Sequence, residues 1–171
     1  MEDAIDNWSY TGSTGANFQI AADGSPPFSN SGIAAGTQYF FFNENGAAAG
    51  ESISQSFATT IDVTYEVTFD VIRLFNGAGT ARINATVTDS VGVIGSSLGA
   101  IDATNGDGGE TFSFTFTATE NTSTLTFLDD FIVTGVDTSL ESVSVVPVPE
   151  PSSSILLGLA GLGLVIRRKR K

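Results

Sequence analysis

The sequence predicts an all-β protein, a β-sandwich of jelly-roll type followed by a C-terminal transmembrane helix. Three observations lead there. Phe, Gly, Thr, Ser and Val dominate the composition, with 13 Phe and 19 Gly against one Trp and one Met, which favours strands and turns over helices. Apolar residues alternate with polar ones in short runs. The last residues form an apolar segment with a cationic end, and 171 residues leave room for one domain before it.

The first half of the chain contains short predicted strands. Two weak ones lie near Trp8 and Phe18, and "TQYFFFNE" and "SISQSF" follow. The run "QYFFF" places rings on both faces of one strand, which is typical of a central strand covered on both sides. Phe40, Phe41 and Phe42 are therefore predicted to belong to the core.

Residues 62–75 alternate with period two, so that one face is apolar and the other is polar. The apolar face consists of Val63, Tyr65, Val67, Phe69 and Val71. An Asn76-Gly77 turn signal follows, and then a second alternating run over 80–89. This arrangement predicts a β-hairpin.

A second hairpin is predicted from 111–118 and 123–129, which flank the turn "ENTS". Phe112, Phe114 and Phe116 form the apolar face of its first strand. The last strand is "SLESVSVV". Eight or nine strands at turn spacings of about 8–15 residues favour a β-sandwich, with a jelly roll as the expected topology.

Composition and charge exclude several kinds of function. The chain has no Cys and no His, which removes thiolate nucleophiles, the usual zinc ligands and disulfides. Its net charge is −12, but five of its seven cations are Arg167, Arg168, Lys169, Arg170 and Lys171. The preceding part has two cations against 19 acids, a net charge of −17, so nucleic-acid binding is not expected.

The C-terminal segment divides the chain into four parts. Residues 1–146 form the predicted sandwich, 147–154 a Pro/Ser-rich linker, 155–166 an apolar helix and 167–171 a basic tail. Twelve residues are short for a permanent anchor, which needs about 20. The positive-inside rule would keep the five cations in the cytoplasm and the sandwich outside. The glycine spacing in this segment, at Gly158, Gly161 and Gly163, is the reverse of the G-x-G-x-x-G order of a dinucleotide fingerprint, so a dinucleotide site is not expected.

Pro149, Glu150 and Pro151, the apolar segment and the terminal Arg/Lys cluster together resemble the PEP-CTERM sorting signal of Gram-negative bacteria. The resemblance implies that an exosortase, a membrane-embedded cysteine transpeptidase, processes the chain near the Pro-Glu-Pro motif. It implies an exported protein that is held in the inner membrane during processing and then released to the cell surface or beyond. The prolines at 147, 149 and 151 predict an extended segment outside any sheet.

The opening "MEDAIDNWSYTG" is acidic and carries no apolar run. A secretory leader therefore either lies upstream of Met1 or is absent, and export is expected from the C-terminal segment.

Several short runs, among them "NWSYTG", "TQYFFFNENG" and "STLTFLDD", resemble galactose-binding-like jelly-roll domains. The resemblance implies a site built from aromatic rings and short polar side chains. Trp8 and Tyr10, near the open start of the domain, are candidate ligand-binding residues. Tyr39 and Tyr65 are further candidate platforms, with the core as the favoured place for Tyr65.

"DATNGDGGE" brings together the oxygen ligands Asp102, Asn105, Asp107 and Glu110 on a glycine-rich loop, a candidate calcium site that does not match the EF-hand spacing. Asp129 and Asp130 are a second possibility. A solvated acidic loop is the alternative to both.

The sequence offers no G-x-S-x-G elbow, and its acids fall on turns and outward strand positions, so an enzyme is not expected. We therefore expect an exported surface or extracellular-matrix protein that binds exopolysaccharide. The alternative is a purely structural envelope or biofilm component without a specific ligand.

Overall fold

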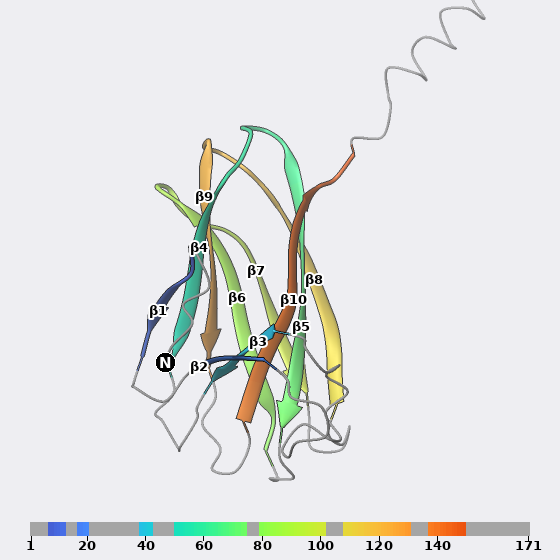
Figure 1. Cartoon of the computed structure of the whole chain (residues 1–171). Coiled ribbons are helices and arrows are strands. Elements are labelled where there is room, and N and C mark those ends of the chain that lie inside the picture. Colours follow the sequence, from blue (N-terminus) through green and yellow to red (C-terminus); the bar gives the residue numbers. More distant parts are fainter. Residues whose placement is uncertain are drawn as a thin grey trace, which may run out of the picture.

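The computed structural model describes residues 7–12, 17–20, 38–42, 50–74, 79–101, 108–130 and 137–149. These residues form ten strands in two five-stranded antiparallel sheets, packed face to face (Figure 1). The first sheet has the order β1 (Ser9–Thr11), β4 (Ser52–Ala58), β9 (Thr122–Asp129), β6 (Ala81–Asp89) and β7 (Gly92–Ile101). The second has the order β2 (Asn17–Ile20), β3 (Gln38–Phe42), β10 (Asp137–Pro147), β5 (Thr64–Leu74) and β8 (Gly108–Thr117). The predicted all-β sandwich is confirmed.

The core lies between the sheets, where the apolar residues of each alternating run meet. On β5, Val67, Phe69 and Val71 are fully buried, while Thr64, Glu66 and Thr68, on the alternate positions, face outward. Phe127 of β9 reaches across from the other sheet and packs edge-on against Phe69, with ring centroids 5.2 Å apart. Burying a side chain of this kind stabilises a fold by about 1.5–3 kcal/mol.

Strand β3 is buried on both faces, as predicted from its run of rings. Phe40 and Phe42 belong to the core between the sheets and pack edge-on with centroids 4.6 Å apart. Phe41 and Tyr39, on the opposite face of the strand, are also buried.

Both predicted hairpins are wrong, although their strands exist. β5 pairs with β8 and β10, whereas β6 pairs with β7 and β9 in the opposite sheet. Likewise β8 lies in the second sheet and β9 in the first. Each connection crosses from one sheet to the other, and the apolar alternation cannot reveal this, because a strand shows the same inward face in either arrangement.

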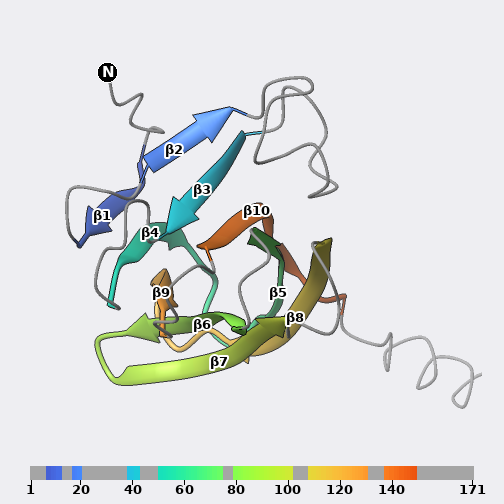
Figure 2. The ribbon, with the colours of Figure 1, turned by 90° about the horizontal axis from the view of Figure 1, so that it is seen from below.

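Strand β7 was not predicted, because glycines occupy its inward positions. A Cβ built on Gly99 would lie 2.7 Å from Cγ2 of Val71 and 3.0 Å from the Phe112 ring, and one on Gly95 would lie 2.7 Å from Cβ of Phe116. The rings of β8 therefore occupy the space that side chains on β7 would need. Figure 2 shows β7 and β8 coming together along this side of the sandwich.

One hairpin among the described residues joins β6 to β7 through a short turn. The carboxylate of Asp89 accepts hydrogen bonds from the backbone N–H groups of Val91 (2.9 Å) and Gly92 (3.3 Å), and Gly92 has a φ of 134°. The Thr119 hydroxyl also donates to this carboxylate. That bond is the largest cause that lowers the pKa of Asp89 below its ordinary value.

Sheet pairing continues past the predicted end of the sandwich. β10 includes Pro147, and the N–H of Val148 donates to the carbonyl oxygen of Thr64 at 2.8 Å. The first two residues of the proline-rich segment are thus attached to β5, where an unpaired segment was expected. The predicted apolar helix 155–166 and basic tail 167–171 lie outside the described residues. Among the residues that the structure describes, no helix is long and apolar enough to cross a membrane.

Candidate functional site: a cavity between β4 and β10

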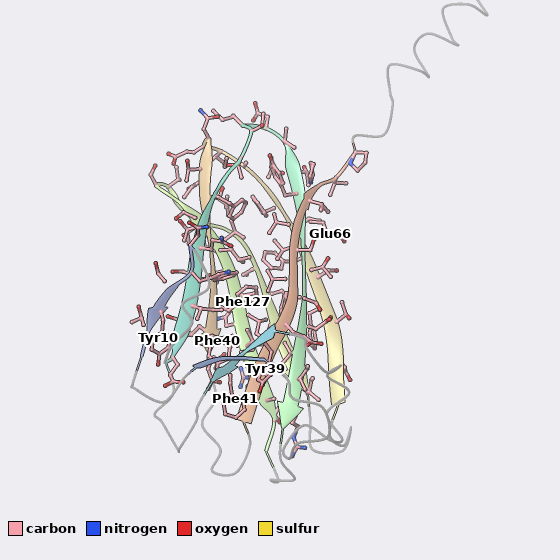
Figure 3. The ribbon with its side chains drawn as sticks, viewed as in Figure 1. Tyr10, Tyr39, Phe40, Phe41, Glu66 and Phe127 are labelled. Carbon is pink, nitrogen blue, oxygen red and sulfur yellow. The ribbon has the colours of Figure 1, made fainter. Side chains whose placement is uncertain are left out.

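A cavity of about 570 Å³ opens between the two sheets on the side of β4 and β10. Most of its buried lining residues are apolar, and its half-buried ones include aromatic and polar side chains. The lining residues are Trp8, Tyr39, Phe40, Ile53, Gln55, Phe57, Ala58, Leu125, Leu140, Glu141, Ser142, Val143 and Val145. Figure 3 labels Phe40, which lines the cavity, and Phe127 of the core, which lies above Phe40 in this view.

The cavity exists because the neighbouring strands β3 and β1 are short. β3 pairs with β10 only through Thr138, Ser139 and Leu140, and β1 pairs with β4 only through Ser52, Ile53 and Ser54. Among the described strands, none covers β10 beyond Leu140 or β4 beyond Ser54 on these edges. The interior between the two sheets therefore stays accessible from this side.

A β-bulge shapes the β10 wall of the cavity. The pairing of β10 with β5 shifts between Glu141 and Ser144, and Ser142 has a φ of 53°. An extra residue in one strand bends it locally and changes the direction of the side chains that follow. Leu140 lies inward before the bulge, and Val143 and Val145 pack against the core after it.

Among the described residues that line the cavity, Glu141 is the only charged one. Its Oε2 atom is buried and has no hydrogen-bond partner among the described residues. Asp70 lies directly opposite it on β5. Burial, and to a smaller extent the charge of Asp70, raise the pKa of the Glu141 carboxyl above its ordinary value.

Of the two candidate ligand-binding residues, Trp8 lines the cavity and Tyr10 does not. Trp8 is half-buried, with its ring 6.2 Å from that of Phe127. Tyr10 is 38% exposed on β1, and its hydroxyl donates to Oε1 of Glu51 at 3.1 Å. Its ring packs against Phe40 at 5.9 Å, and Figure 3 shows it at the outer edge of the first sheet. A ligand role for either ring stays a prediction.

The other two tyrosines differ in position. Tyr39 is 2% exposed and contributes to the cavity wall. Tyr65 stacks on Phe116 with ring centroids 5.3 Å apart, and its hydroxyl accepts a hydrogen bond from the N–H of Thr60 at 2.9 Å. Tyr65 thus packs at the margin of the core.

The predicted calcium ligands cannot be placed together. Asp102, Asn105 and Asp107 lie outside the described residues, and Glu110 is exposed on β8. The two residues of the second candidate pair lie in different surroundings. Asp129 is buried, whereas the carboxylate of Asp130 forms an ion pair with Arg82 at 3.2 Å. The described ranges hold no cluster of three or more acidic residues placed to bind a metal. Calcium binding stays a prediction.

Sequence reasoning missed Glu141, Gln55 and Phe57 as cavity residues. A signal for the bulge was present in "SLESVSVV", because the apolar positions run Leu140, Val143 and Val145 and so slip by one residue after Leu140. Such a slip in a period-two pattern marks an extra residue in the strand.

Solved structures that share this fold include carbohydrate-binding-module jelly rolls. The N-terminal cellulose-binding domain of a β-1,4-glucanase from Cellulomonas fimi matches with a TM-score of 0.54 at 14% identity, over 88% of this chain and 94% of that one. The xylan-binding domain of a Paenibacillus barcinonensis xylanase matches with a TM-score of 0.51 at 13% identity, over 83% and 87%. An adhesin domain of Lys-gingipain from Porphyromonas gingivalis gives 0.57 at 13% identity, over 85% and 93%.

Residues 147–171 match the PEP-CTERM protein-sorting motif. The resemblance of the C-terminal segment to that signal is therefore confirmed, and the motif implies a protein that is exported and transiently anchored in a membrane before processing. Among curated protein sequences, none matches this chain.

Proposed function

We propose that this chain is a non-enzymatic surface or extracellular-matrix protein whose sandwich binds polysaccharide in the cavity between β4 and β10. The observation that carries the proposal is the combination in one accessible cavity of rings, from Trp8 and Phe57, with polar groups, from Gln55 and Glu141. Aromatic rings contact the apolar faces of sugars, and fixed polar groups orient their hydroxyls. The structural neighbours named as cellulose-binding and xylan-binding domains support the same class of ligand.

Affinity gel electrophoresis of the purified full chain in mild detergent tests this function against soluble xylan, cellulose derivatives and galactan. We expect at least one polysaccharide to retard the chain in a saturable manner. Trp8→Ala should weaken that binding by about tenfold, or ~1.4 kcal/mol. Gln55→Ala is a second variant that leaves the core rings intact, and Val91→Ala, on a residue 80% exposed in the β6–β7 turn, is the control.

If no glycan gave saturable retardation, a purely structural envelope or biofilm component would replace this proposal. If Val91→Ala weakened binding as much as the two cavity variants do, the binding surface would lie elsewhere.

The sorting part of the proposal is that an exosortase cuts the chain near Pro149, Glu150 and Pro151 and releases the sandwich from the inner membrane. The match of 147–171 to the sorting motif supports it, and so does the exposure of Pro149 directly after the last paired residue. Mass spectrometry of the protein from its native cell should find a mature chain without the basic residues 167–171. A chain intact through Lys171 in the cytosol would contradict this proposal.

A further inference from the structure

Three turns meet at one end of the sandwich. The N–H of Thr59, in the β4–β5 turn, donates to the carbonyl oxygen of Asn121, in the β8–β9 turn, at 2.9 Å. The hydroxyl of Ser90, in the β6–β7 turn, donates to the carboxylate of Glu120, which also belongs to the β8–β9 turn. Figure 1 shows these turns and the end of β10 toward the top of the molecule. We call this part of the sandwich, the three turns with the last residues of β10, the exit end.

The chain leaves the sandwich at the exit end. The N–H of Val148 donates to the carbonyl oxygen of Thr64, the first residue of β5 after the β4–β5 turn. Five residues, 150–154, separate Pro149 from the apolar segment 155–166. Because an extended chain spans at most about 3.6 Å per residue, this connection reaches no farther than about 20 Å. An apolar segment held in a membrane therefore keeps the exit end close to the bilayer surface.

Large apolar side chains are exposed at the exit end. Ile61 of the β4–β5 turn is 48% exposed, Val91 of the β6–β7 turn 80%, and Val93 at the start of β7 63%. With Val146, near the end of β10, they make up four of the six exposed large apolar side chains in the described ranges. Single exposed apolar residues are ordinary on a protein surface, whereas a group of them at one place marks a contact surface.

The charges at the exit end do not favour an anionic partner. The carboxylates of Asp89 and Glu120 accept hydrogen bonds from the groups of the β6–β7 turn and stay negative there. The two arginines of the described ranges belong to the opposite end, Arg73 near the end of β5 and Arg82 near the start of β6. Since like charges repel, the partner of this surface is apolar and carries no net negative charge.

We infer that the exit end lies on the surface of a lipid bilayer, with Ile61, Val91 and Val93 as its contact residues, while the C-terminal segment is held in the membrane. The inference rests on the sorting part of the proposed function and adds a second membrane contact to it. The three side chains enter the boundary between headgroups and acyl chains, on lipids whose headgroups have no net charge. An apolar segment of 12 residues is short for a span, and a second contact strengthens a marginal anchor.

The absence of cysteine from the chain allows a spin label to be placed at one chosen residue. Full chains with Val91→Cys or Leu98→Cys are labelled and reconstituted into phosphatidylcholine vesicles. Leu98 is also apolar, 46% exposed and part of β7, but it lies farther from the exit end. Paramagnetic resonance then compares collisions with oxygen, which concentrates in lipid, and with a water-soluble nickel complex. We expect the ratio of oxygen to nickel collisions to be severalfold higher at Val91 than at Leu98.

Charge substitutions in the Val91-labelled chain test the contact itself. Ile61→Asp places a carboxylate in the proposed contact and should lower the collision ratio at Val91 to the value found at Leu98. Leu98→Asp adds the same charge at an exposed position away from the exit end and should leave the ratio unchanged. Vesicles that contain anionic phosphatidylglycerol should lower the ratio in the chain without either substitution.

A Val91 label that collided mainly with the nickel complex, in a chain inserted into vesicles, would overturn the inference while leaving the sorting proposal in place. A contact that needed a protein partner would give this same result, since the vesicles hold lipid alone. Lipid-like ratios at both labels would mean that the sandwich lies on its side, and a higher ratio on anionic vesicles would mean electrostatic attraction; either contradicts the inference. If the full chain did not enter vesicles at all, the membrane anchorage in the proposed function would fail with it.

Discussion

Glu141 connects the geometry of the cavity to the stability of the fold. Its pKa is raised above the ordinary value of 4.5, first by burial and then by Asp70. A carboxyl whose pKa is higher in the folded state favours folding while it is protonated. That stability is fully present below about pH 4.5, the unfolded value, and is lost as the pH rises through the folded pKa.

Glu141→Gln should therefore raise the melting temperature at neutral pH, and the gain should shrink as the pH is lowered toward 4.5, the value at which the unfolded carboxyl titrates. Thermal melts followed by circular dichroism at a series of pH values measure this difference. Ser144→Ala, an exposed change on the same strand, is the control and should show no pH-dependent difference from the parent chain. A gain that was constant across the series would contradict the assignment.

Gly99 shows how a single residue fixes the distance between the sheets. The space for its Cβ is already filled by Val71 and by the rings of Phe112 and Phe69. We expect Gly99→Val to destabilise the protein by about 1–3 kcal/mol, the usual cost of overpacking a core. Urea denaturation measures the loss, and Ser96→Val, on an exposed position of the same strand, is the control that should change the midpoint little.

At the scale of the element, the bulge in β10 can be tested at Ser142. A β-branched residue is poorly tolerated at a φ of 53°, and strain of this kind costs about 1–3 kcal/mol. Ser142→Val should therefore lower the free energy of unfolding by that amount, whereas Ser142→Gly should leave it nearly unchanged or raise it. Similar unfolding midpoints for the two variants would show that the bulge relaxes without the left-handed conformation.

The strands themselves were largely predictable, because a half-buried sandwich strand displays its inward face in every second residue. β5, β6, β8 and β9 illustrate this, and the double-sided ring pattern of β3 identified a strand covered on both faces. β7 escaped prediction since its inward positions at Gly95 and Gly99 carry no side chain to reveal the period. A strand can thus be part of the fold without showing a period-two apolar pattern in the sequence.

Pairing partners were not predictable in the same way. The connection after β5 and the connection after β8 both lead into the opposite sheet, while their turn residues suit a hairpin equally well. What decides between the two is the packing of ten strands together, which no local run of residues encodes. For the same reason the cavity could be anticipated only in part: Trp8 was found from its position in the chain, but Glu141 required the bulge and the short length of β3.

At the scale of the molecule, the last strand of the sandwich runs into the segment that matches the sorting motif, since Pro147 ends β10 and begins the match. The last described hydrogen bond of the sheet joins Val148 to Thr64. We expect a chain that ends at Val148 to unfold cooperatively at the same temperature as the full chain, because none of the described strand pairs is removed. Scanning calorimetry of both chains provides the comparison.

A chain that ends before Asp137 lacks β10, and we expect it not to fold. β10 lies between β3 and β5 in the second sheet, so its removal leaves the hydrogen-bonding edges of both neighbours without a partner and opens the core at Leu140. Loss of the near-ultraviolet circular dichroism signal is the expected readout. A cooperative melt in this shorter chain would contradict the central role given to β10.

The position of β10 also affects when the protein can fold during its synthesis. The strand that joins the two halves of its sheet is synthesised after all the others, directly ahead of the segment that matches the sorting motif. Until β10 has been synthesised, β3 and β5 have no common neighbour and the second sheet cannot form. A chain synthesised only as far as β9 therefore lacks the strand that joins β3 to β5, and we expect folding to be completed only once β10 has been made.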